Sequence, residues 1–143
     1  MKKYLWLNIL LFCSAMTMAQ KDQSDVFKGT IENAAYRIFI KMNLIDNNIT
    51  VPGQDLFGKL PGFLGDSIDS RTWLFTSATL SGNTATLYIT NDYGSEDLVA
   101  TLSYNQDNTF LLKQKEGSDL KIVRDRKWKK LPKEIIFIRK PTE

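Results

Sequence analysis

The sequence predicts an all-β fold: an antiparallel meander of about eight to nine strands that closes, fully or partly, into a barrel, with a two-sheet β-sandwich as the alternative. Apolar and polar residues alternate through residues 73–104, and turn residues recur at intervals of about ten residues. Ala85, Leu87 and Ile89 share one face of the middle run, because successive strand side chains point to opposite sides. Residues 73–104 therefore predict three strands joined by two turns.

The N-terminus has the pattern of a secretory signal peptide. Lys2 and Lys3 precede an apolar run over residues 4–15, and Ala19 ends a stretch of small residues. We expect cleavage after Ala19, which leaves residues 20–143 as a single all-β domain in a secreted or periplasmic location. The apolar run is shorter than the ~20 residues that span a bilayer, so no transmembrane segment is expected after cleavage.

The composition of the mature chain excludes several kinds of catalysis. The sequence has no histidine, and its only cysteine, Cys13, lies in the predicted signal peptide. A lipid anchor on Cys13 is an alternative, but bacterial lipoproteins usually have a small residue before that cysteine and here it is Phe12. Without histidine or cysteine there is no Ser-His-Asp triad, Cys-His pair or ordinary zinc site. The composition favours a protein that is not an enzyme and has no cofactor.

Strands are predicted at residues 26–32 and 36–42, and a further short strand at residues 49–51 follows a turn of acidic and amide residues. Residues 36–42 and 49–51 are expected to form a hairpin. The alternation of apolar and polar residues ends there, because residues 52–72 contain two prolines and four glycines, which are unusual in the interior of a sheet. We expect a long loop there.

The predicted loop at 52–72 is rich in apolar side chains, including Leu56, Phe57, Phe63 and Leu64. Three interpretations remain open. The loop plugs one end of a barrel or covers a sheet face, it forms a lid over an apolar ligand cavity, or it exposes a patch that docks on a protein or membrane.

The turn at residues 91–97 concentrates polar oxygen atoms. Asp92, Glu96 and Asp97 make it a weak candidate for a hard cation such as calcium, but the spacing does not match an EF-hand loop. A polar hairpin loop is the favoured interpretation, and no metal is expected.

Strands are also predicted at residues 110–113 and 120–124. The continuous apolar run at residues 135–138 indicates a final strand that is buried on both faces.

Charge is distributed unevenly along the chain. Residues 20–112 contain 6 basic and 11 acidic residues, a net charge of −5, whereas residues 113–140 contain 11 basic and 4 acidic residues, a net charge of +7. A basic surface is predicted around one tryptophan; its members are Arg124, Arg126, Lys127, Trp128, Lys129 and Lys130. Such a cluster can bind phosphates or anionic glycans, or it can protect a sheet edge from aggregation. Secretion argues against a nucleic-acid partner.

In strand number and size the chain resembles the calycins, the group of lipocalins and fatty-acid-binding proteins. Lipocalins carry a Gly-x-Trp motif near the first strand, and residues 28–31 supply the glycine, Gly29, without the tryptophan. The resemblance implies a small β-barrel, but no ligand-binding residue is carried over from it.

Two functions are consistent with these patterns. The first is a secreted or periplasmic module that binds an apolar small molecule inside the barrel; the residues expected near its mouth are Leu56, Phe57, Phe63, Leu64 and Trp73. The alternative is a protein-interaction or inhibitor module of the cell envelope that uses the 56–64 loop and the basic surface. The first requires an internal cavity of ~300 Å³ or more, and the second a filled interior. A monomer is expected in either case, and an enzyme that uses loop carboxylates is a third possibility.

Overall fold

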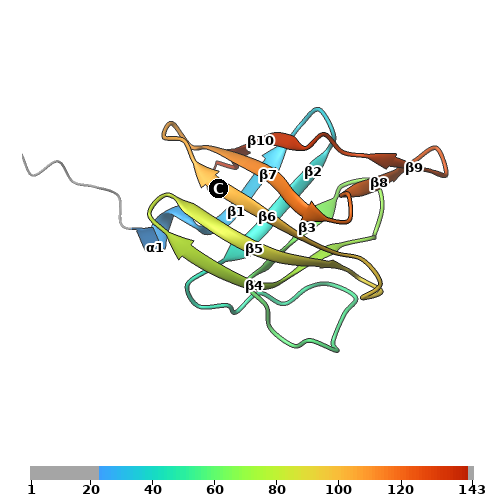
Figure 1. The fold of residues 1–143 in the computed structure, drawn as a ribbon, viewed down its shortest axis with the longest axis horizontal. Coiled ribbons are helices and arrows are strands. Elements are labelled where there is room, and N and C mark those ends of the chain that lie inside the picture. The colour runs from blue at the N-terminus through green and yellow to red at the C-terminus, as the bar shows by residue number, and fades with distance from the viewer. Residues whose placement is uncertain (1–22, 142–143) are drawn as a thin grey trace, which may run out of the picture.

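The computed structural model describes residues 23–141 and shows a closed, eight-stranded antiparallel β-barrel (Figure 1), so the predicted fold class is confirmed. A four-residue helix, α1 (Gln23–Val26), precedes the strands; these are β1 (Lys28–Asn33), β2 (Ile38–Asn43), β3 (Gly62–Asp66), β4 (Trp73–Ser81), β5 (Thr84–Asn91), β6 (Asp97–Tyr104), β7 (Thr109–Gly117), β8 (Lys121–Arg124), β9 (Lys127–Lys130) and β10 (Glu134–Arg139). No helix in this part of the chain is long and apolar enough to cross a membrane. The predicted signal peptide and Cys13 lie outside the described residues.

The barrel is an up-and-down meander with one insertion. Its strands are hydrogen-bonded in the order β1-β10-β7-β6-β5-β4-β3-β2, and β8 and β9 form a separate two-stranded sheet between β7 and β10. The predicted strands of residues 73–104 are β4, β5 and β6. The barrel closes where Ile31 and Glu32 pair with Arg139 and Ile138, so the sandwich alternative does not apply. The Arg139 guanidinium strengthens this seam by donating hydrogen bonds to the carbonyls of Lys28 and Val26.

Side chains fill the barrel interior. Phe27, Phe75, Phe110 and Phe137 are among the largest fully buried side chains, and they belong to one continuous apolar cluster. An eight-stranded barrel has an interior just wide enough to be filled by side chains. These aromatic rings lie in the core of the barrel.

The prediction that residues 52–72 form one long loop is wrong, because Gly62–Asp66 forms β3 between β2 and β4. The glycines serve close packing there instead of breaking the strand. A Cβ atom at Gly62 would lie 2.5 Å from the Lys41 carbonyl oxygen, and one at Gly65 would lie 2.5 Å from the Phe39 ring. Contacts this short are essentially not seen for a real Cβ, and at Gly62 the clashing atom belongs to the main chain, so the close approach of β2 and β3 there depends on glycine.

The predicted hairpin of residues 36–42 with 49–51 is also wrong. Ile49 pairs with Leu60 in an isolated bridge, and β2 pairs with β3. Residues 44–61 connect these strands and contribute to a second apolar cluster with the outward-facing side of β3 and β4, which consists of Ile49, Val51, Leu60, Phe63 and Leu74. The connection therefore covers one outer face of the barrel.

The final strand, β10, is buried on one face only. Ile135 and Phe137 point into the barrel, whereas Ile136 and Ile138 are 57% and 56% exposed. The prediction of a strand buried on both faces is wrong, because a barrel strand has an outer side and nothing in the described chain covers it here.

Candidate functional site

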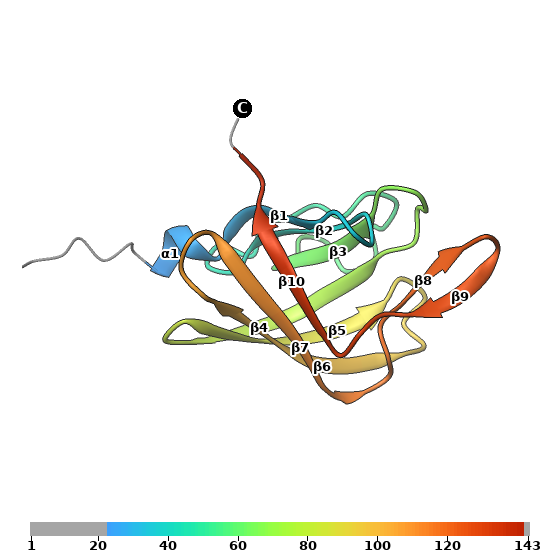
Figure 2. The same ribbon diagram turned by 90° about the horizontal axis from the view of Figure 1, so that it is seen from above.

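The β8–β9 hairpin projects away from the barrel, as Figures 1 and 2 show from two directions. Its base is rooted in the core, since Leu120, Ile122 and Leu131 are buried in the main apolar cluster. All four residues of β9, in contrast, are exposed. The hairpin is therefore a firmly attached element that is not needed to close the barrel.

One arginine of β8 ties the hairpin to the barrel. The Arg124 guanidinium donates to both carboxylate oxygens of Asp66 at the end of β3, at 2.6 and 3.0 Å. It also donates to the Tyr36 carbonyl at 2.6 Å. The Asp66 side chain is only 5% exposed, so this ion pair is well shielded from water. Paired bonds to a carboxylate fix direction as well as distance, so they set the orientation of the hairpin.

The tip of the hairpin is a two-residue turn with an unusual residue in it. Asp125 and Arg126 both have positive φ, at 53° and 64°. A two-residue turn with positive φ at both positions prefers Asn-Gly or Asp-Gly, because a side chain in this conformation costs about 1–2 kcal/mol. The chain thus carries a long cationic side chain at a position that favours glycine.

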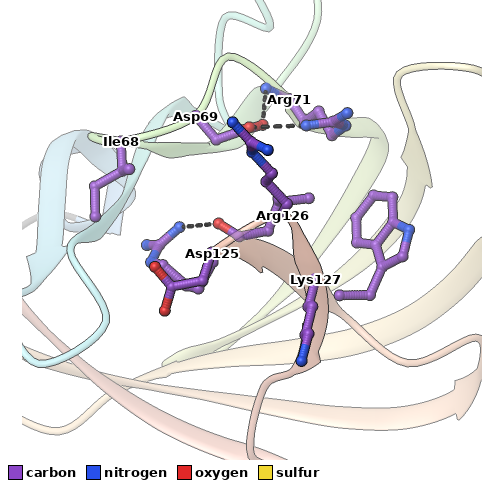
Figure 3. A pocket seen from close by; sticks show the side chains of 9 residues that line it. Ile68, Asp69, Arg71, Asp125, Arg126 and Lys127 are labelled. Carbon is purple, nitrogen blue, oxygen red and sulfur yellow. Dashed lines mark hydrogen bonds and ion pairs between the residues drawn. The ribbon is translucent and has the colours of Figure 1, made fainter.

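A groove of about 550 Å³ separates the hairpin from the connection between β3 and β4 (Figure 3). Ile68, Asp69 and Arg71 line it from the connection, and residues 123–128 line it from the hairpin. Figure 3 shows the Arg126 side chain extending toward Asp69 and Arg71. The groove therefore has a cationic rim on the hairpin side.

Within the groove, Asp69 is held by its neighbour Arg71. The Arg71 backbone N–H donates to Asp69 at 3.0 Å and its guanidinium donates at 2.8 Å. The backbone hydrogen bond is the largest cause of a lowered pKa of Asp69, and partial burial opposes it. Asp69 and Arg71 thus form an internal ion pair.

Trp128 on β9 is the aromatic part of the site. Its side chain is 59% exposed, and the cationic groups of Arg71 and Lys121 lie 5.3 and 5.6 Å from its ring centroid. A second hollow, of about 160 Å³, shares Arg71 and Trp128 and reaches the β5–β6 turn. An exposed tryptophan held by cations offers a large, preoriented contact surface.

The cations of the site divide into paired and unpaired groups. Lys121 pairs with Glu96, and both Lys130 and Lys133 pair with Asp119. Hydrogen bonds from Lys133 and then from Lys130 lower the pKa of Asp119. Within residues 23–141, the salt bridges include no partner for Arg126, Lys127 or Lys129. Arg126 and Lys127 are available to an outside group, and the Lys129 ammonium lies 5.5 Å from the centroid of the Tyr36 ring.

No family model, curated protein or solved structure matches this chain. The fold and the geometry of the hairpin are therefore the grounds for assigning a function.

Of the residues predicted to line the mouth of an apolar cavity, the structure brings together Leu64 and Trp73, which are register partners on β3 and β4, and places the others elsewhere. Leu56 and Phe57 lie exposed on the 44–61 connection, and Phe63 packs in the cluster on the outer face. Leu64 and Trp73 point into the main core, where the Trp73 indole donates to the Lys121 carbonyl at 3.1 Å. Binding of an apolar molecule in the barrel stays a prediction.

Two of the three carboxylates in the weak cation candidate at residues 91–97 have other partners. Glu96 pairs with Lys121 at 2.9 Å, and Asp92 accepts a hydrogen bond from the Thr72 backbone at 3.3 Å. No cluster of three or more histidine, cysteine or acidic residues that could hold a metal occurs among the residues described.

The six residues of the predicted basic surface lie on a single hairpin, but Arg124 is engaged with Asp66 of the barrel, and Lys127 and Lys129 lie on the opposite face of β9 from Trp128 and Lys130. The residues of the barrel that face or bind this hairpin were not predicted; they are Asp66, Asp69, Arg71 and Tyr36. They lie 50 or more positions away, and nothing in the sequence links them to Arg124 or Trp128.

Proposed function

We propose that this protein is a non-enzymatic interaction module, secreted or periplasmic, whose β8–β9 hairpin docks on an acidic surface of a partner protein. One observation carries the proposal. Arg126, Lys127 and Lys129 have no salt-bridge partner in the described chain, and they lie beside the exposed Trp128 in the sequence of a hairpin that projects from the barrel.

Tryptophan and arginine are the residues that most often dominate the energy of a protein interface. Lysines at the rim speed and orient the encounter with an acidic partner. The Arg124–Asp66 pair holds the hairpin in one orientation before binding. A rigid binding element loses little conformational freedom on association, which supports affinity.

The calycin-like alternative, an apolar molecule inside the barrel, has less support. Phe27, Phe75, Phe110 and Phe137 are fully buried in the interior where that ligand would lie. The likeness to calycins rests on the eight-stranded closed barrel, an architecture that serves many functions.

The proposal is tested with a fluorescein-labelled peptide of ten residues in which glutamate and valine alternate. Binding is followed by fluorescence anisotropy over a range of salt concentrations. Lys127→Glu/Lys129→Glu is compared with Lys41→Glu/Lys115→Glu, which changes the net charge equally at exposed positions on β2 and β7.

We expect the hairpin variant to weaken binding roughly tenfold, since each reversal at a rim costs about 0.5–1 kcal/mol. The control variant should stay within about twofold of the unmodified chain. Equal effects of the two variants, or no binding of the peptide at low salt, would refute the proposed function.

A further inference from the structure

The two strands of the hairpin present different main-chain edges. Arg124 and Lys127 flank the two-residue turn and pair with each other, and Ile122 pairs with Lys129 two residues further. The Leu131 N–H donates to the Leu120 carbonyl at 2.8 Å, in the same register. In an antiparallel ladder, residues that bond across the pair alternate with residues whose N–H and C=O groups point outward. The outward-pointing groups therefore belong to Lys121 and Val123 on β8, and to Trp128 and Lys130 on β9.

The β8 edge is already occupied. The Lys121 carbonyl accepts the Trp73 indole N–H at 3.1 Å, and the Val123 carbonyl accepts the Arg124 guanidinium at 2.7 Å. Lys121 also pairs through its side chain with Glu96, and Arg124 with Asp66. This edge faces the barrel and is protected from other chains.

The β9 edge is open. Among residues 23–141, β9 pairs only with β8, and no hydrogen bond occupies the outward main-chain groups of Trp128 and Lys130. An open strand edge is a template on which another strand can add. Pairing of β9 with β9 of a second copy would bring lysines of both chains together, so like-charge repulsion opposes self-association.

We propose that β9 binds its partner by strand addition: an extended acidic segment of the partner protein pairs with the open edge of β9. This inference rests on the proposed function and specifies how the same surface binds. The N–H and C=O groups of Trp128 and Lys130 supply the main-chain bonds. Charge complementarity selects the segment, because exposed lysines alone would repel a basic strand.

The alternation of side chains defines the pattern of that segment. Lys127 and Lys129 point to one face of β9, and Trp128 and Lys130 point to the other. A segment with an acidic residue at every second position places its carboxylates beside Lys127 and Lys129. Apolar residues between them contact Trp128. The Glu-Val peptide described above has this pattern.

A pair of variants at Lys130 tests the main-chain bond. Lys130→Ala removes the side-chain charge and keeps the backbone N–H, whereas Lys130→Pro removes both. Proline is tolerated on an edge strand when its missing N–H would face away from the sheet, as it does here. We expect Lys130→Pro to bind the peptide roughly fivefold more weakly than Lys130→Ala, the effect of one hydrogen bond.

Modified peptides give a test that leaves the protein unchanged. In one peptide every glutamate nitrogen is methylated, and in the other every valine nitrogen. Since alternate residues of a strand face opposite edges, one of these peptides should lose binding at least tenfold and the other should retain it. In the protein, the Trp128 and Lys130 amides should exchange with solvent at least tenfold more slowly when the unmodified peptide is bound.

The outcomes separate this inference from the proposed function. If the unmodified peptide binds through Lys127 and Lys129, yet both methylated peptides bind equally well and the two amides are not protected, strand addition is refuted and the acidic docking surface stands. If the unmodified peptide does not bind at all, both are refuted. Loss of one methylated peptide only, together with protection of the two amides, supports strand addition.

Discussion

Arg124→Met should release the hairpin from the barrel at a measurable cost in stability. The variant removes the bonds that Arg124 makes to both carboxylate oxygens of Asp66 and to the Tyr36 carbonyl. Breaking a buried ion pair from one side costs about 3–5 kcal/mol, because the remaining charge stays buried and unpaired. The Arg124 side chain is 21% exposed, and Asp66 keeps a hydrogen bond from the Ile68 N–H at 2.9 Å. We therefore expect a loss of about 2–4 kcal/mol in the free energy of unfolding.

Urea unfolding followed by tryptophan fluorescence measures this loss, and Trp73, which contacts the hairpin through Lys121, reports on the region. Arg126→Met is the matched control, since it makes the same chemical change in the adjoining turn and should cost less than about 0.5 kcal/mol. The double variant Asp66→Asn/Arg124→Met removes both charges and should recover most of the loss. A cost below about 1 kcal/mol for Arg124→Met, or strictly additive costs in the double variant, would show that the pair does not anchor the hairpin.

Phe63→Ala should lower the free energy of unfolding in urea by about 3–5 kcal/mol, because the ring is buried in the outer cluster. Phe57→Ala, at a side chain that is 43% exposed, should lower it far less. Similar losses for the two variants would refute this account of the 44–61 connection. Arg126→Gly should leave the free energy of unfolding within about 1 kcal/mol of the original value or raise it, because glycine adopts a positive φ without steric cost. The same variant should weaken peptide binding. A loss of stability above about 1 kcal/mol would contradict the strain argument. The pKa of Asp119 is lowered in the folded state by its bond from Lys133, so its contribution to stability is present above the unfolded-state pKa and is lost as pH falls below about 4. Urea midpoints measured between pH 2 and 6 should therefore fall less steeply for Asp119→Asn, and identical slopes would refute a role for this carboxylate.

The meander was predictable because its signal is local. In β5, residues such as Ala85, Leu87 and Ile89 alternate with polar ones, and each turn has residues suited to it. The number of such strands and the lack of a helical pattern predicted a barrel or a sandwich, and the choice between them depends on the pairing of β1 with β10, which the sequence does not show. β3 was missed because its glycines break strands in most contexts. Their role depends on Lys41 and Phe39 of the neighbouring strand, which the sequence alone does not place beside them.

The candidate site was predictable only in part, for a similar reason. Arg124 to Lys130 are contiguous, so their charge and their tryptophan were visible as a cluster. The division into structural and available cations was not visible, because it depends on Asp66, Glu96 and Asp119. The open edge of β9 likewise depends on register, which is set by the tight turn at Asp125 and Arg126.

The pairing of β1 with β10 determines when the barrel can close during folding. Glu32 pairs with Ile138, so the last register of the barrel joins residues more than a hundred positions apart. Ordering such a long intervening chain is slow compared with forming a hairpin, and the other strand pairings of the barrel join consecutive strands of the meander. During synthesis, strands β2 to β7 can pair before the C-terminal strand has been made. The sheet stays open until β10 pairs with β1 and Arg139 donates its hydrogen bonds to the carbonyls of Val26 and Lys28. Loss of β10 would thus leave an open sheet with unpaired strand edges, which can associate with other chains, rather than a slightly shortened barrel.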